Sequence, residues 1–218
     1  MTTYQGHVSP GGVPAVHELA HLIVTKVSVG PQDNNAYVLR CRYTLDELLI
    51  DAAAEPERLL ATCGDGPLRR VVTTHRHPDH WQALADVVDA TGAATVAHVD
   101  DAPGIPVPTT EPVRDGDVIQ VGTCVLTVVH LTGHTPGSIA LLYDDPTGAP
   151  HVWTGDSLFP GGLGKTAGPA EFTALLGDVR RKLFDRLPDE TWVYPGHGND
   201  TTLGAERPHL DEWRARGW

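Results

Sequence analysis

The sequence predicts a mixed α/β fold in which two β-sheets each carry helices on one face. Short apolar segments rich in Val, Ile and Leu recur with strand-like length, and two segments place apolar residues at helical spacing. Turns rich in Gly, Pro and Asp separate them, and no repeat or low-complexity segment interrupts them. Because each sheet and each helix must bury an apolar face, this order of elements predicts packed layers.

The expected elements follow one another in two halves. In the first half we expect strands near 22–29, 36–42, 47–51 and 70–74, a helix from about 80 to 90, and a strand near 94–98. In the second half we expect strands near 117–121, 124–130, 138–143 and 151–154, and a helix over 170–184. Residues up to about 14 are rich in Gly and Pro and are expected to form a loose N-terminal arm.

Length and composition bound the class of protein. The 218 residues, 40% of them hydrophobic, suffice for one core, so a single domain over 1–218 is expected. With 28 acidic against 16 basic residues, a nucleic-acid surface is disfavoured. The sequence shows no signal-peptide pattern or bilayer-length apolar run, and Cys41, Cys63 and Cys124 lack C-x-x-C spacing. We expect a cytoplasmic protein with reduced thiols and no membrane partner; nothing in the sequence signals an oligomeric state.

Four metal-competent side chains lie within the six residues 75–80, which read His-Arg-His-Pro-Asp-His. Imidazole and carboxylate groups hold zinc or iron while leaving coordination positions open. In an extended segment side chains at i and i+2 share a face, so His75 and His77 can point at one ion. Asp79 and His80 lie one turn onward and can reach a second ion. The alternative is a histidine-rich surface loop in which Asp79 caps the following helix.

Three isolated candidates follow, each in a glycine-containing turn after a strand-like segment. They are His134 after 125–129, Asp156 after 151–154, and His197 in the segment Pro-Gly-His-Gly at 195–198. Taken singly, each has an ordinary interpretation as a capping or turn residue. Turns that follow different strands can nevertheless converge at one sheet edge, which is what a metal site requires.

The ordered set resembles the metallo-β-lactamase superfamily, and within it the glyoxalase II type of hydrolase. The matching motifs are T-H-x-H-x-D-H at 74–80, G-H-T-x-G at 133–137, G-D-x-L-F at 155–159 and P-G-H-G at 195–198, and the resemblance spans about 23–204. It implies a four-layer αββα sandwich with two divalent metal ions at one edge. The implied ligands are His75, His77 and His134 for one ion, Asp79, His80 and His197 for the other, and Asp156 as the bridge.

The resemblance also assigns roles to two residues outside the ligand set. Asp51, at the end of a strand-like segment, would support the ligands from behind, although an ordinary strand-ending residue is an equal alternative. Lys165 lies in a segment similar to the glyoxalase II G-x-G-K, whose lysine contacts a carboxylate of the glutathione moiety. We therefore assign it substrate binding, with a solvated loop lysine as the alternative.

The implied chemistry is hydrolysis of a thioester of a small thiol. Two cations about 3.5–4 Å apart can activate a shared water and polarise a carbonyl, and Asp79 would both bind the second ion and orient the hydroxide. A thiolate leaves without a proton and is a good ligand for zinc. Zinc is the first expectation, with iron or manganese as alternatives because mixed histidine and carboxylate sites accept several metals.

Two departures from full-length glyoxalase II bear on the substrate. Residues 198–218 are too few for the helical extension that supplies much of the glutathione contact, so the chain resembles the compact relatives. Trp81 and Gln82 replace the small residues, often glycines, that follow the H-x-D-H motif, and the bulky Trp81 either narrows the pocket or joins the core.

Other functions remain as alternatives. One is a persulfide dioxygenase that uses a single iron; retention of His80 and His197 favours the two-metal hydrolase over it. A lactonase or β-lactamase type of hydrolase and a non-catalytic metal-binding protein are the others. The segment His17-Glu-Leu-Ala-His21 also satisfies the zinc-protease pattern H-E-x-x-H, but β-prone residues 22–29 follow it at once, so we reject the helix that this pattern needs.

Overall fold

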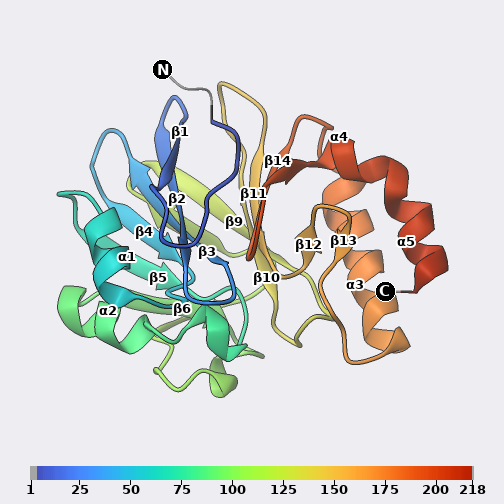
Figure 1. The fold of residues 1–218 in the computed structure, drawn as a ribbon, viewed down its shortest axis with the longest axis horizontal. Helices are drawn as coiled ribbons and strands as arrows, with labels where there is room; N and C mark the ends of the chain where they lie inside the picture. The colour runs from blue at the N-terminus through green and yellow to red at the C-terminus, as the bar shows by residue number, and fades with distance from the viewer. Residues whose placement is uncertain (1–3, 218) are drawn as a thin grey trace.

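The computed structural model describes residues 4–217 as two β-sheets packed face to face (Figure 1). The first sheet has seven strands in chain order: β1 (Ala15–Glu18), β2 (Leu22–Val29), β3 (Asn34–Cys41), β4 (Glu47–Ile50), β5 (Leu68–Val72), β6 (Ala94–His98) and β7 (Glu111–Val113). The second has six, in the order β15 (Thr201–Thr202), β14 (Trp192–Pro195), β11 (His151–Gly155), β10 (Ile139–Tyr143), β9 (Cys124–His130) and β8 (Val118–Val121). A small hairpin joins β12 (Leu158–Phe159) and β13 (Gly162–Leu163).

Helices cover the outer face of each sheet. On the first sheet lie α1 (Pro56–Thr62) and α2 (Leu84–Thr91), whose buried leucines and valines pack against β2 to β5. On the second lie α3 (Pro169–Val179), a π-helical turn (Arg180–Phe184) and α5 (Leu210–Arg216), with α4 (Leu203–Glu206) between β15 and α5. Figure 1 shows the two helical layers on opposite flanks of the paired sheets. The predicted αββα sandwich is therefore confirmed.

A third apolar cluster fills the space between the sheets. It joins residues such as Leu39 and Ile50 of the first sheet to Leu126, Leu141 and Trp153 of the second, all of them almost fully buried. Each such side chain contributes about 1.5–3 kcal/mol when fully buried. This shared core fixes how the ends of the two sheets face each other, and so fixes the loops at their edge.

The main elements lie close to the positions predicted from the sequence, with differences at their ends. The helix expected over 80–90 begins instead as a 3₁₀ turn, Pro78–His80, and α2 starts only at Leu84. The helix expected over 170–184 changes to a π turn after Val179. We did not predict α1, α4 or six of the shorter strands, because segments of two to seven residues carry too little periodicity.

Residues 4 to 6 are held against the sheets. The Tyr4 hydroxyl donates to Asp200 Oδ2 at 2.6 Å, and the carbonyl of Gly6 accepts from Lys26 Nζ at 2.9 Å. These contacts contradict the expectation of a loose arm at residues 4 and 6; residues 1–3 lie outside the described range. His17 lies in β1, so the rejection of the zinc-protease helix is confirmed. Within residues 4–217 no helix has the length and apolar character needed to cross a membrane.

Candidate metal centre

Strand direction brings the candidate ligands to one edge of the sandwich. β4 and β5 are parallel, so Asp51 and the segment that starts at His75 leave the first sheet at the same end. β11 and β14 are parallel, and β9 runs in the same direction because β10 is antiparallel to both β9 and β11. The loops that carry His134, Asp156 and His197 therefore leave the second sheet together. Two backbone bonds, from Asn35 N to Gly196 O (2.7 Å) and from Ile139 N to Thr74 O (3.0 Å), join the two sheets beside these loops.

The candidate side chains form three overlapping groups. In the first, His75 Nε2 lies 3.0 Å from His77 Nδ1 and 3.2 Å from His134 Nε2. In the second, Asp79 Oδ2 lies 3.6 Å from His80 Nε2 and 3.4 Å from His197 Nε2. The third group contains His75, His80 and Asp156 and connects the other two. Imidazole nitrogens and a carboxylate gathered this closely have the spacing of ligands around a shared cation.

Asp156 lies between the first two groups. Its Oδ2 is 3.7 Å from His134 Nε2 and 3.5 Å from His197 Nε2, and its Oδ1 is 3.4 Å from His80 Nε2. Among the described residues, Asp156 Oδ1 and His80 Nε2 have no hydrogen-bond partner, although both atoms are buried. A buried polar atom without a partner is costly. These two atoms are 3.4 Å apart, a separation that two ligands of the same cation can have.

In His75 and His80, the Nδ1 atom, which faces away from the centre, is held by a hydrogen bond. Asp51 accepts from Thr74 N (2.7 Å), from Thr74 Oγ1 (2.8 Å) and from His80 Nδ1 (2.8 Å). Because Thr74 Oγ1 donates its proton to Asp51, the same Oγ1 accepts a hydrogen bond from His75 Nδ1 at 3.1 Å. One buried carboxylate thus orients His80 directly and His75 through Thr74, and leaves both Nε2 atoms free to face the centre.

Backbone carbonyls do the same for the second sheet. His134 Nδ1 donates to Lys165 O at 2.7 Å, and His197 Nδ1 donates to Gln32 O at 2.9 Å. Asn34, which the sequence analysis missed, donates from Nδ2 to Asp79 O (2.9 Å) and to Asp79 Oδ2 (3.0 Å). Two adjacent asparagines at the start of an apolar strand were the available signal, because amides in such a place need buried partners.

The electrostatics of the group of His75, His77 and His134 differ from those around His80 and Asp156. Burial, reinforced by neighbouring imidazoles, lowers the pKa of His75 and of His77, and burial also lowers the pKa of His134. These three rings are therefore neutral, as metal ligands must be. Burial would lower the pKa of His80, but Asp51 and Asp156 raise it; burial would raise that of Asp156, but His80 holds it low. The surroundings of His80 and Asp156 thus favour positive charge, which a divalent cation supplies.

Two glycines permit the close packing of the ligands. A Cβ atom on Gly196 would lie 2.2 Å from Asp156 Oδ1 and 2.8 Å from His80 Cε1. A Cβ on Gly164 would meet the carbonyl oxygen of Asp156 and would lie 3.2 Å from His134 Nδ1. Both positions exclude any side chain, so the glycines of the two motifs are steric requirements of the centre.

A cavity of about 560 Å³ opens onto the centre. Lys165 and Thr166 line it beside the candidate ligands, and Lys165 Nζ is the one ammonium among its lining residues. Trp81 lies outside it: its Nε1 donates to Arg76 O at 2.9 Å and its ring packs against the core under α1 and α2. Of the two roles considered for Trp81, joining the core is the one that the structure supports.

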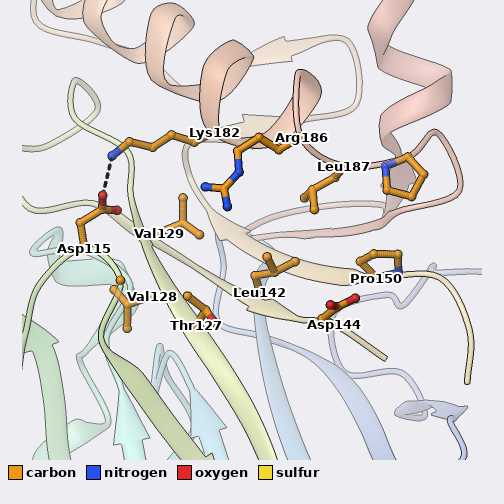
Figure 2. Close-up of a pocket in the computed structure, with 12 residues that line it drawn as sticks. Asp115, Thr127, Val128, Val129, Leu142, Asp144, Pro150, Lys182, Arg186 and Leu187 are labelled. Atoms are coloured by element: carbon orange, nitrogen blue, oxygen red, sulfur yellow. Dashed lines mark hydrogen bonds and ion pairs between the residues drawn. The ribbon is translucent and has the colours of Figure 1, made fainter. Parts of the chain in front are cut away.

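Two other features lie away from this centre. His98, Asp100 and His130 also form a compact group, but the rings of His98 and His130 are stacked, with centroids 4.0 Å apart and planes 23° apart. Lone pairs in nearly parallel rings point side by side and do not converge on one ion. A cavity of about 490 Å³ on the outer face of the second sheet contains Lys182 paired with Asp115, and none of the candidate ligands lines it (Figure 2).

Comparisons with known proteins find relatives in sequence and in fold. The hydroxyacylglutathione hydrolase of Polaromonas sp. (strain JS666 / ATCC BAA-500) is 36% identical over 180 residues, covering 81% of this chain and 66% of that protein. The crystal structure of ETHE1 from Myxococcus xanthus has a TM-score of 0.77 at 30% identity, covering 88% of this chain and 84% of the other. That of TTHA1623 in a di-iron-bound form has a TM-score of 0.71 at 35% identity, covering 84% and 96%.

A sequence model of one family covers most of the chain. It describes the metallo-beta-lactamase superfamily and matches residues 29–197, which include every candidate ligand. The fold, the ligand groups and this match are consistent with one another. The chain therefore belongs to the metallo-β-lactamase superfamily.

Proposed function

We propose that the protein is a dinuclear metal-dependent hydrolase that cleaves the thioester of a small thiol. The observation that carries the proposal is the buried, partnerless pair His80 Nε2 and Asp156 Oδ1, 3.4 Å apart, between two complete ligand groups. His75, His77 and His134 would hold one ion, Asp79, His80 and His197 the other, and Asp156 would contact both. When bound, two divalent ions supply Lewis acidity that activates water and polarises the scissile carbonyl.

The protein's own residues bind and orient the reactants. Asp79 lines the cavity, and Asn34 holds its Oδ2 toward His80 and His197, so its other oxygen can accept a proton from the attacking water. Lys165 has an exposed side chain at the cavity and would bind an anionic group of the thiol carrier. Because a thiol has a pKa of about 8.5, the leaving thiolate departs without a dedicated acid.

The relatives support the same reaction class. The hydroxyacylglutathione hydrolase of Polaromonas acts, by its name, on an acyl thioester of glutathione, and it shares 36% of its aligned residues with this chain. The di-iron-bound form of TTHA1623 is consistent with a pair of cations, and zinc, iron and manganese all suit a mixed histidine and carboxylate set.

Thiol release from S-lactoylglutathione tests the proposal. Purified protein reloaded with zinc or iron is compared with chelator-treated protein, with Asp156→Ala, and with Asp100→Ala, which alters a carboxylate in the remote histidine group. We expect metal-dependent release that Asp156→Ala abolishes and Asp100→Ala leaves intact. If loaded protein releases no thiol but consumes oxygen with a glutathione persulfide, the proposal is wrong and the single-iron dioxygenase is the better hypothesis.

A further inference from the structure

Lys26 has an unusual position for a lysine. It lies in the middle of β2 with its side chain fully buried, whereas lysine is almost never fully buried unless it is paired. Its ammonium group donates to Gly6 O at 2.9 Å, to Gly198 O at 2.7 Å and to Asp200 Oδ1 at 2.6 Å. All three donors of the ammonium group are therefore used.

Asp200 completes a closed network. Its side chain is also inaccessible to solvent, and its Oδ2 accepts from the Tyr4 hydroxyl (2.6 Å) and from Trp192 Nε1 (3.1 Å). Replacing a buried ion pair by apolar residues is often neutral or even stabilising. Stability alone therefore does not account for this pair.

The network holds the loop that follows His197. Gly198 O, one residue after the ligand, accepts from Lys26 Nζ and also from Asn35 Nδ2 at 2.9 Å. The N-terminal segment closes the loop from the other side, because Asp200 N donates to Gly6 O at 3.0 Å and the His7 ring pairs with Asn199 Oδ1 at 2.6 Å. Every residue from 198 to 200 thus bonds either to Lys26 or to residues 4–7.

We propose that the Lys26–Asp200 ion pair, together with residues 4–7, is a positioning device for His197 and so for the second cation. The inference rests on the proposed two-cation site. The ion pair fixes the backbone on the carboxyl side of His197, while Gln32 O fixes the ring through Nδ1. Because the group of Asp79, His80 and His197 gains one of its three ligands from this loop, loosening the loop weakens that group alone.

The other cation group offers a matched control. His134 follows β9, and the end of β9 is held by a different lysine, because Lys182 Nζ donates to His130 O at 2.7 Å. The same ammonium donates to Asp115 Oδ2 at 3.2 Å (Figure 2). Lys182→Met removes an ammonium that also contacts a backbone carbonyl near a ligand loop, but on the side of the first cation. It must therefore leave the second cation unaffected.

Zinc titration of chelator-treated protein, in competition with a chromophoric chelator, tests the inference. The wild-type chain is expected to bind two equivalents. His197→Ala identifies which equivalent binds at the group of Asp79, His80 and His197, and this is called the second equivalent. Lys26→Met and Asp200→Asn are expected to weaken that equivalent at least 10-fold and to keep the other at wild-type affinity, since lost support of a ligand typically costs 10–100-fold in affinity. Lys182→Met is expected to keep the second equivalent at wild-type affinity.

A milder variant guards against misfolding of the Lys26 and Asp200 variants. Tyr4→Phe removes one hydrogen bond to Asp200 and keeps the ion pair, so we expect a smaller loss, about 3-fold, confined to the second equivalent. A purely structural role would weaken both equivalents together, or neither, in every folded variant, and that result would overturn the inference. A single equivalent in the wild-type chain would instead overturn the proposed two-cation function, and the inference with it.

Discussion

Replacing Gly196 by alanine tests the geometry of the centre most directly. The added Cβ would lie 2.2 Å from Asp156 Oδ1 and 2.8 Å from His80 Cε1, so both groups must move away from it. Normal contact with the carboxylate oxygen requires a shift of about 1 Å, whereas ligand distances in metal sites hold within about 0.2 Å. We expect Gly196→Ala to weaken cation binding at least 100-fold and to abolish hydrolysis.

The cost in folding is expected to be modest. Overpacking by one methyl group typically costs about 1–3 kcal/mol, which a domain of this size withstands. Gly92→Ala is the matched control, because Gly92 lies at the end of α2, has a φ of +70°, and its added Cβ would meet no atom within 4 Å. That variant pays about 1–2 kcal/mol in backbone strain but leaves the ligands in place.

Metal content after dialysis, zinc affinity and thermal unfolding distinguish the two variants. We expect similar losses of melting temperature in both and a loss of bound metal in Gly196→Ala alone. Wild-type affinity in a folded Gly196→Ala protein would refute the assignment of Asp156 and His80 to one centre. Equal loss of metal in both variants would show that a general loss of stability, and not the contact with Asp156, controls binding.

Three further predictions follow from the same structure. Asp51 has a left-handed backbone (φ 58°) that asparagine tolerates, so Asp51→Asn keeps the fold while it disturbs the bonds to Thr74 and His80; we expect zinc affinity to fall 10–100-fold in chelator competition. Lys165→Met is expected to raise KM about 5-fold at unchanged kcat for an anionic thioester, and to leave KM for a neutral thioester unchanged. Burial lowers the pKa of His151 to about 4, so the unfolded chain binds the additional proton between pH 6.5 and 4; acidification from pH 8 to pH 5 therefore costs about 2 kcal/mol of stability through this residue. In urea unfolding at pH 8 and pH 5, His151→Gln is expected to lose about 2 kcal/mol less stability on acidification than the wild-type chain. If both proteins lose the same stability, the assignment to His151 is wrong.

How far the sequence predicts this protein depends on the length of the pattern involved. Strands such as β2, β3 and β9 have seven or eight residues, most of them apolar, and the sequence analysis located them. β12, β13 and β15 have two residues each, and form only because neighbouring segments place them side by side. Their pairing is a tertiary effect with no local signal.

The same distinction applies to the centre. The seven candidate ligands lie in four short sequence motifs, so the sequence alone identifies these side chains. Asn34 and the carbonyl of Gln32 act on residues more than 40 positions away, and nothing near them in sequence indicates those partners. The N-terminal segment was assigned as loose because Gly and Pro are typical of loops, but Tyr4 and Gly6 bond to a loop nearly 200 residues later.

The candidate ligands are divided between the two sheets, and this division ties cation binding to the packing of the sandwich. The segment from His75 to His80 belongs to the first sheet, whereas His134, Asp156 and His197 belong to the second. A cation that contacts both sets joins the sheets at an edge where Asn35 N to Gly196 O is one of few direct backbone links between them. Because such a site exists only in the folded chain, every increment of binding free energy is also an increment of folding free energy. The Lys26–Asp200 pair and Asp51 are costly to bury. That cost is understandable if these groups hold the two ligand sets at the separation that a shared cation requires.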